Sequence, residues 1–134
     1  MTAVRRVLLD THVVLWAMRE PARLGSQREL LEDASVARML SAVVVWEVAI
    51  KVGLGRLQLP VAVDDWAWSA ASDLAAERVP ITDLHAAAVA DLPLHHRDPF
   101  DRLLVAQARL LDVPIATADA ALRAYDVEIV QVGS

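Results

Sequence analysis

The stretch that decides the fold is DPFDRLLVAQARLLDVPIAT, residues 98–117. Pro99 suits the first position of a helix and Asp98 suits the N-cap before it, so the pattern predicts a helix from Pro99 through Leu111. The apolar run Val113–Thr117 follows almost at once and predicts a buried strand. A helix that leads directly into a buried strand is typical of proteins in which the two kinds of element alternate.

The same alternation extends in both directions from this segment. The expected strands are Val4–Asp10, Val36–Ala42, Val79–Ile81, Val113–Thr117 and Val127–Val132. Besides the helix at Pro99, the expected helices are Val13–Arg19, Ser26–Ala34, the second half of Val43–Val52, Trp66–Glu77, Thr82–Ala90 and Asp119–Tyr125. Ser26 and Glu29 match a capping box, and Gly53 and Gly55 mark a helix end. Strands alternating with helices predict an α/β sandwich on a parallel sheet.

Length and composition limit the class of protein. With 134 residues, the chain is expected to form one domain over residues 1–134. Cysteine is absent, which excludes disulfides, a thiolate zinc site and a cysteine nucleophile. No apolar run approaches the roughly 20 residues of a membrane helix, and the N-terminal segment lacks the pattern of a secretion signal. A soluble cytoplasmic protein that does not contact membranes is therefore expected.

Charge and hydrophobicity bear on the binding partners. The net charge is −5, the wrong sign for a protein that simply coats nucleic acid. That objection weakens if several acids share one pocket and are neutralised by a divalent metal. Hydrophobic residues make up 56% of the chain, whereas an ordinary soluble domain has roughly 45–50%. Some of this apolar surface is expected to contact a partner.

Four acidic residues occupy positions that a parallel sheet can bring to one edge. Asp10 ends the first expected strand, and Asp119 lies just past the strand Val113–Thr117. Glu47 and Asp101 lie early on expected helices and join the other two if those helices lean over this edge. In open parallel sheets, binding sites form beyond the carboxyl ends of the strands.

Each acid also has a purely structural explanation. Asp10 can be a turn residue and Asp119 a helix cap, while Asp101 in a first helical turn suits the helix dipole. Glu47 can face solvent and pair with Lys51, four residues on. Both flanks of Glu47 are apolar, however, and a buried carboxylate is costly unless it is paired or bound to a cation. Asp101 likewise lines up with apolar residues three, four and seven positions later, where a cap alone does not require an acid.

Considered together, the four carboxylates favour a metal site. Like charges this close repel one another unless cations lie between them. Mg²⁺ and Mn²⁺ prefer oxygen ligands and are commonly held by a few carboxylates and a substrate phosphate. Such a metal lowers the pKa of bound water, stabilises developing charge and orients the leaving oxygen, and phosphodiester hydrolysis needs all three.

Four segments of the chain carry a further signal. They are LLDTHVVLW (Leu8–Trp16), SAVVVWEVAIKVGLGRL (Ser41–Leu57), LPLHHRDPFDRLLVAQA (Leu92–Ala108) and ATAD (Ala116–Asp119). In this order, and over nearly the whole chain, they resemble the motifs of PIN domains, specifically those of VapC-type toxins from bacterial toxin–antitoxin pairs. The third segment is the most specific. The four acids match the family positions without a departure.

The resemblance implies a three-layer α/β/α sandwich with a central, mostly parallel sheet, and an endoribonuclease that uses Mg²⁺ or Mn²⁺. It implies that the four acids bind metal directly or through water, and that metal-activated water attacks an RNA phosphate in line to leave a 5′-phosphate and a 3′-hydroxyl. Thr11 and Thr117 are then expected to orient carboxylates or a metal-bound water. Asp98 is expected to cap its helix, with accessory metal contact as the alternative. The implied partners are a second copy of the chain and a small cognate antitoxin.

Basic residues near the acidic motifs are candidates for contacts to RNA phosphates. They are Arg97, Arg102, Lys51 and Arg56, and each can instead be a solvated charge or the partner of an acid. His95, His96 and His85 suggest a zinc site, but the chain has neither cysteine nor an HExxH pattern to support one. We expect His95 and His96 to be loop or dimer-surface residues, or phosphate contacts beside Arg97.

Other functions fit the sequence less well. A phosphatase with an aspartyl nucleophile usually has a second acid two residues later, where this chain has His12. A receiver domain needs a lysine near its C-terminal strands, and Lys51 is the only lysine of the chain. The remaining alternative is a catalytically inactive PIN-like module that binds RNA or protein. Such a module would be expected to lose acids from the cluster, and this chain retains the full set.

Overall fold

A computed structural model describes residues 4–133, and strands and helices alternate through most of this range. The strands are β1 (Arg6–Leu9), β2 (Ala37–Ser41), β3 (Glu77–Val79), β4 (Ile115–Thr117) and β5 (Ile129–Gln131). The α-helices are α1 (Thr11–Arg19), α2 (Arg28–Glu32), α3 (Ala42–Gly53), α4 (Val63–Asp73), α5 (Asp83–Ala88) and α6 (Pro99–Leu111). Three short 3₁₀ helices complete the list, namely η1 (Pro21–Gln27), η2 (Val89–Asp91) and η3 (Ala120–Ala124).

The five strands form one sheet in the order β3-β2-β1-β4-β5. Every neighbouring pair is parallel, and Leu8 in β1 pairs with Met39 of β2 on one side and with Ile115 of β4 on the other. The chain thus builds outward from β1 in one direction and then returns to add β4 and β5 on the other side. The reversal of strand order between β1 and β4 places a crevice beyond their carboxyl ends, where ligands bind in open α/β sheets.

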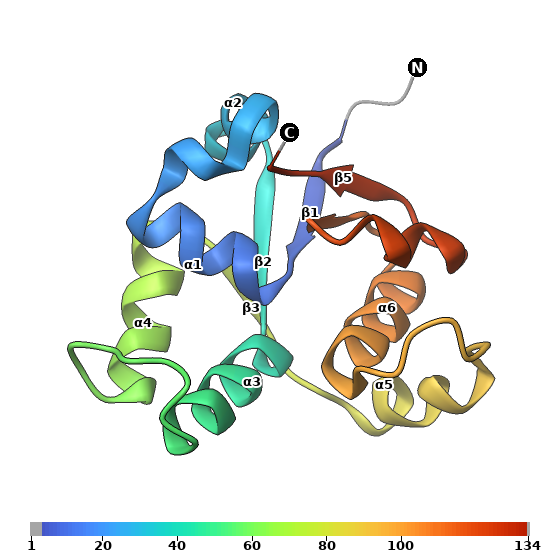
Figure 1. The fold of residues 1–134 in the computed structure, drawn as a ribbon. Coiled ribbons are helices and arrows are strands. Elements are labelled where there is room, and N and C mark those ends of the chain that lie inside the picture. Colours follow the sequence, from blue (N-terminus) through green and yellow to red (C-terminus); the bar gives the residue numbers. More distant parts are fainter. Residues whose placement is uncertain (1–3, 134) are drawn as a thin grey trace.

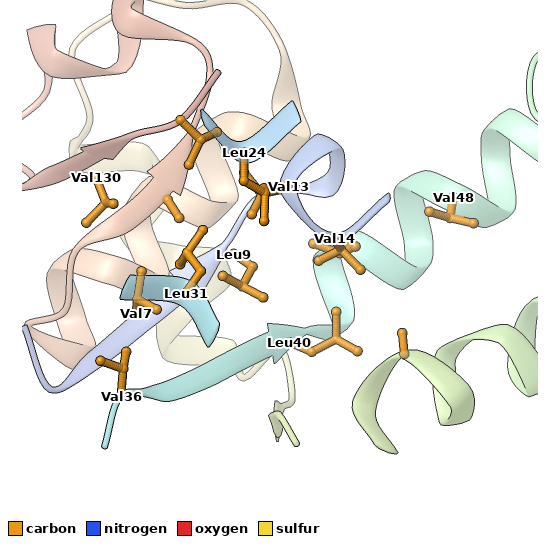
Figure 2. Close-up of a cluster of buried hydrophobic side chains, with 14 of the residues drawn as sticks. Val7, Leu9, Val13, Val14, Leu24, Leu31, Val36, Leu40, Val48 and Val130 are labelled. Carbon is orange, nitrogen blue, oxygen red and sulfur yellow. The ribbon is translucent and has the colours of Figure 1, made fainter. Parts of the chain in front are cut away.

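The sheet has a hydrophobic core on each face. Because side chains alternate along a strand, Leu9 packs in one core and its neighbour Leu8 in the other, and Leu40 and Met39 of β2 divide in the same way. Figure 1 shows α1, α2 and α4 on one side of the sheet and α5 and α6 on the other. Figure 2 shows the core beneath α1, where Val7 and Leu9 of β1 meet side chains from the covering helices. The expected α/β sandwich on a parallel sheet is confirmed.

The local predictions at Ser26 and at Val43 are wrong. Ser26 does not open a helix with a capping box, because it lies inside η1, and the N-cap of α2 is Gln27, which makes no side-chain cap hydrogen bond. The segment from Val43 is helical throughout, and not only in its second half. The Ser41 hydroxyl accepts a hydrogen bond from the Val43 amide at 3.0 Å, and Val43 is fully buried. The cap and the burial of this segment outweigh the strand preference of its β-branched residues.

Among residues 4–133, no helix combines the length and the apolar character that crossing a membrane requires.

Candidate active site

A pocket of about 350 Å³ opens beyond the carboxyl ends of β1 and β4. It is lined by Asp10, Thr11, His12, Trp16, Glu47, Lys51, Asp98, Asp101, Ala118 and Asp119. All four acids singled out in the sequence therefore share one pocket, and Thr11, Asp98 and Lys51 lie beside them. Asp10 and Asp119 come from the strand ends, while Glu47 and Asp101 come from α3 and α6, which pack against each other.

Asp10 is held in place by the helix that follows it. Its Oδ1 accepts a hydrogen bond from the Val13 amide at 2.9 Å, which makes Asp10 the N-cap of α1, and the residue is only 6% exposed. Burial raises the pKa of the Asp10 carboxyl, and the Thr117 side chain and the Val13 amide partly offset the rise. Asp10 can cap the helix and also serve the pocket, because the cap uses only Oδ1 of its carboxylate.

Glu47 is buried, as its apolar flanks indicate, and it is also paired. Its side chain accepts a hydrogen bond from the Thr11 hydroxyl at 2.7 Å and forms an ion pair with Lys51 at 2.6 Å between Oε2 and Nζ. The Glu47 side chain is 8% exposed and that of Lys51 is 33% exposed. Thr11 is therefore placed to orient Glu47, and the ammonium group of Lys51 lies at the pocket wall.

Asp101 lies in the first turn of α6, directly under the cap that Asp98 makes. The Asp98 carboxylate accepts hydrogen bonds from the amides of Phe100 and Asp101, at 2.8 and 3.2 Å. Burial raises the pKa of Asp101 to about 7, and the negative charges of Asp98, Asp10 and Glu47 contribute to the rise. Asp98 is thus a helix cap that also lines the pocket.

The raised pKa of Asp101 predicts that the metal-free protein loses stability as the pH rises. The folded state binds this proton more tightly than the unfolded chain, whose aspartate pKa is about 3.9. The stabilisation is complete below that value and is lost as the pH rises through about 7. Asp101 is partly exposed, so solvent reduces the effect. We expect the free energy of unfolding of Asp101→Asn, relative to that of the wild type, to rise by about 1–2 kcal/mol between pH 5 and pH 8 in EDTA, as measured by urea unfolding.

Asp126→Asn is the matched control for this experiment, because Asp126 is exposed and does not line the pocket. Its stability relative to the wild type should not change over the same pH range. Parallel pH profiles for wild type and Asp101→Asn would contradict the prediction.

Asp119 caps η3, and it is contacted by His96, a contact that the sequence did not predict. Asp119 Oδ1 accepts the Ala121 amide at 3.0 Å, and the Asp119 amide donates to the Thr117 hydroxyl at 3.0 Å. His96 Nε2 lies 3.1 Å from Asp119 Oδ2 and 3.5 Å from Asp101 Oδ2. The sequence suggested a loop or dimer-surface residue, or a phosphate contact beside Arg97, and its signal for His96 was closeness to the acidic motif in the chain.

The other basic candidates lie outside the pocket. Arg56 and Arg97 are exposed and do not line it. The Arg102 guanidinium donates to the carbonyls of Val89, Leu92 and Pro93 and to the Tyr125 hydroxyl, at 2.9–3.4 Å. Arg102 therefore holds the 92–98 loop against α6.

The three histidines considered for zinc are not gathered in one place. His85 accepts the Thr82 amide in the cap of α5 and contacts Gln107, while the ring of His95 packs against Tyr125. Among residues 4–133, the cluster of potential metal ligands that meets at short distance is His96, Asp101 and Asp119.

Comparison with known proteins identifies relatives of this chain. The model of the PIN domain family matches residues 7–128. Over 120 residues, the chain is 32% identical to ribonuclease VapC22 of Mycobacterium tuberculosis, which covers 89% of this chain and 91% of that protein. Among solved structures, VapBC2 from Rickettsia felis, bound to a DNA fragment from its promoter, is similar with a TM-score of 0.68 and 13% identity, covering 95% of this chain and 98% of the other. VapBC-5 from Mycobacterium tuberculosis gives a TM-score of 0.61 and 23% identity, with 96% and 99% covered.

Proposed function

This chain belongs to the PIN-domain family and has a VapC ribonuclease among its relatives, and from this premise we propose that it is a divalent-metal-dependent endoribonuclease and the toxin of a toxin–antitoxin pair. The single observation that carries the proposal is the convergence of Asp10, Glu47, Asp101 and Asp119 on one pocket. These four residues are the proposed catalytic acids. A binding-only module would not need to bring four carboxylates together against their mutual repulsion.

The donor set of the pocket fits a hard divalent cation. The pocket offers carboxylate oxygens and no thiolate, and Mg²⁺ and Mn²⁺ prefer oxygen ligands of this kind. Burial and neighbouring negative charge raise the pKa of Asp101 to about 7, and burial also raises that of Asp10. A cation among these groups would relieve both effects, because it stabilises the charged forms of the carboxyls. We propose Mg²⁺ as the cofactor, with Mn²⁺ able to substitute.

The residues of the chain prepare the site for phosphodiester hydrolysis. When bound, the cation supplies activation of water and stabilisation of charge on the phosphate. The N-cap bond to Val13 fixes Asp10, and the Thr11 hydroxyl fixes Glu47. The Thr117 hydroxyl accepts a hydrogen bond from the Asp119 amide and so fixes the Asp119 backbone. Among residues 4–133, Lys51 is the lysine or arginine that lines the pocket, so we assign the phosphate contact to it rather than to Arg102, whose guanidinium is bonded to loop carbonyls.

Lys51→Met is expected to affect RNA and metal in opposite directions. Loss of the ammonium removes a phosphate partner, so the KM for RNA should rise about fivefold and the salt dependence of binding should weaken by about one counterion. The same loss removes a positive charge next to Glu47, so the Mg²⁺ concentration for half-maximal rate should fall. Steady-state cleavage over a range of salt and Mg²⁺ measures both changes. Lys51→Arg keeps the charge and serves as control; if both values move in the same direction, the assignment is wrong.

The proposed protein partners of this chain are an antitoxin and a second copy of the chain. Two of the similar structures are of VapBC systems, so we propose that a small cognate antitoxin binds and inhibits this chain. Large exposed side chains supply apolar surface for such an antitoxin and for a homodimer, namely Trp46, Leu54, Trp68, Leu84 and Leu94. A cytoplasmic location is part of the same proposal.

The decisive experiment is an RNA-cleavage assay with folded, partner-free protein. We expect total RNA to be cut in Mg²⁺ or Mn²⁺, the cutting to stop in EDTA, and the products to carry 5′-phosphates and 3′-hydroxyls. Mg²⁺ should also raise the melting temperature, since a ligand that binds only the folded state stabilises it by mass action. A folded protein that binds RNA but never cuts it would instead support the binding module.

A further inference from the structure

His96 lies between two of the proposed metal-binding carboxylates and is not one of the family's acids. Its Nε2 is 3.1 Å from Asp119 Oδ2 and 3.5 Å from Asp101 Oδ2. The His96 side chain is 24% exposed, so the contact is partly shielded from solvent. His96 therefore either binds the metal itself or orients the carboxylates that do.

His96 is held at its backbone and at its ring. Its backbone amide donates to the hydroxyl of Tyr125 at 2.9 Å, and Tyr125 is only 3% exposed. Its Nδ1 accepts the backbone amide of Asp98 at 3.1 Å, at the start of α6. The loop that carries His96 is further held by Arg102, which bonds the Pro93 carbonyl. The direction of Nε2 is thus set by the fold and does not depend on a bound ligand.

The hydrogen bond at Nδ1 determines what Nε2 can do. A nitrogen that accepts an N–H carries no proton, so in neutral His96 the ring proton lies on Nε2. An Nε2 that carries the proton donates a hydrogen bond and has no lone pair for a metal. The partner of this donor is Asp119 Oδ2, the closer of the two carboxylate oxygens.

The two carboxylate oxygens of Asp119 have different partners. Its Oδ1 accepts the Ala121 amide at 3.0 Å in the cap of η3. Its Oδ2 accepts no such backbone amide and is the oxygen that His96 contacts, so Oδ2 is the atom that His96 can position for a cation. A carboxylate oxygen can accept a hydrogen bond on one side while it binds a metal on the other.

We propose that His96 is a positioning residue that holds Asp119 Oδ2 beside Asp101 for the divalent cation, and that it is not itself a metal ligand. The inference rests on the proposed function, because it concerns the same cation site. The donated hydrogen bond offsets part of the repulsion between the Asp101 and Asp119 carboxylates. It also restrains the Asp119 side chain before the metal binds, so less conformational entropy is lost on binding. Loss of hydrogen-bond partners of this kind typically weakens metal affinity by about 10–100-fold.

Four variants separate the hydrogen bond to Asp119 from the general order of the loop. His96→Ala removes both ring contacts. His96→Asn keeps an acceptor for the Asp98 amide but is too short to reach Asp119, whereas His96→Gln carries an N–H group toward Asp119. His95→Ala is the matched control, because His95 is exposed on the same loop and packs against Tyr125.

Mn²⁺ affinity, measured by calorimetry on the full chain, tests the proposal without relying on activity. We expect His96→Ala and His96→Asn to bind Mn²⁺ at least about tenfold more weakly than wild type, His96→Gln to recover most of the loss, and His95→Ala to match wild type. Equal affinity in all four variants, or an equal loss in His95→Ala, would overturn the role of His96. A wild type that binds no Mn²⁺ would overturn the proposed function as well.

Pulsed electron paramagnetic resonance of bound Mn²⁺ distinguishes the positioning role from direct ligation. We expect no coupling of the strength that a directly bound imidazole nitrogen gives, in wild type and in His95→Ala alike. A strong nitrogen coupling that disappears in His96→Ala would mean that His96 is a ligand, and the proposal would be wrong although the metal site stands.

Discussion

Asp10→Asn is expected to lower metal-dependent RNA cleavage at least about 1000-fold while the protein stays folded. Asparagine is as good an N-cap as aspartate, so the hydrogen bond from the Val13 amide to Oδ1 can persist. The substitution removes the negative charge of the carboxylate, which a hard cation prefers to a neutral amide. A 1000-fold loss corresponds to about 4 kcal/mol of transition-state stabilisation. Single-turnover cleavage in saturating Mg²⁺ measures the effect.

Thermal unfolding of the same protein shows whether the loss comes from the metal site. In EDTA, Asp10→Asn should melt at or above the wild-type temperature, because burial disfavours the charged carboxyl that it replaces. The rise in melting temperature on adding Mg²⁺ should disappear. Asp64→Asn, on the exposed first turn of α4, is the control and should change neither cleavage nor the Mg²⁺ effect. Substantial cleavage by Asp10→Asn would exclude Asp10 from the proposed mechanism.

The acids could be found from the sequence because the parallel topology fixes where strands end. Asp10 and Asp119 follow apolar strands directly, and parallel neighbouring strands bring their carboxyl ends to the same edge. Glu47 was conspicuous because a charged residue lies inside an apolar run, and the structure buries it. Patterns of this kind depend on the spacing of apolar residues, which can be read directly from a sequence.

His96 and Arg102 could not be assigned in the same way, because their roles depend on contacts between distant segments. The Asp98 amide orients the ring of His96, and the hydroxyl of Tyr125, which is 29 residues away in the chain, holds its backbone. Arg102 looked like a phosphate contact because it follows an acidic motif, and its hydrogen bonds to loop carbonyls exist only in the folded chain. The expected capping box at Ser26 is absent for a different, local reason: Gly25, with φ of 65°, kinks the chain before α2 and leaves Ser26 within η1.

A buried polar residue on α6 links the two helices that carry Glu47 and Asp101. Gln107 is 0% exposed, and its Oε1 accepts a hydrogen bond from the Ser41 hydroxyl at 2.6 Å. Its Nε2 lies 3.2 Å from the Pro80 carbonyl, to which it donates, and 3.2 Å from His85 Nδ1. Because Ser41 is the N-cap of α3, this contact fixes the start of α3 against the middle of α6.

Gln107→Met is therefore expected to destabilise the protein and to slow cleavage together. Methionine keeps most of the volume, but the Ser41 hydroxyl proton loses its buried partner, at a cost of about 2–3 kcal/mol. For a chain of this length, that corresponds to a fall of about 10 °C in melting temperature. Since α3 and α6 hold Glu47 and Asp101, looser packing between them should also lower the cleavage rate about tenfold at a temperature where the variant is fully folded.

Leu110→Ala on the same helix separates the network from a general effect of changing α6. Leu110 is 52% exposed, so its substitution should cost little stability and leave cleavage unchanged.

The double variant Ser41→Ala/Gln107→Met gives the stronger test, because removal of both partners leaves no unpaired hydroxyl and should cost less than the sum of the single changes. If the two changes were simply additive in urea unfolding, the hydrogen bond between Ser41 and Gln107 would not couple the helices. If Gln107→Met lost stability but cleaved RNA at the wild-type rate, the network would support the fold without positioning the acids.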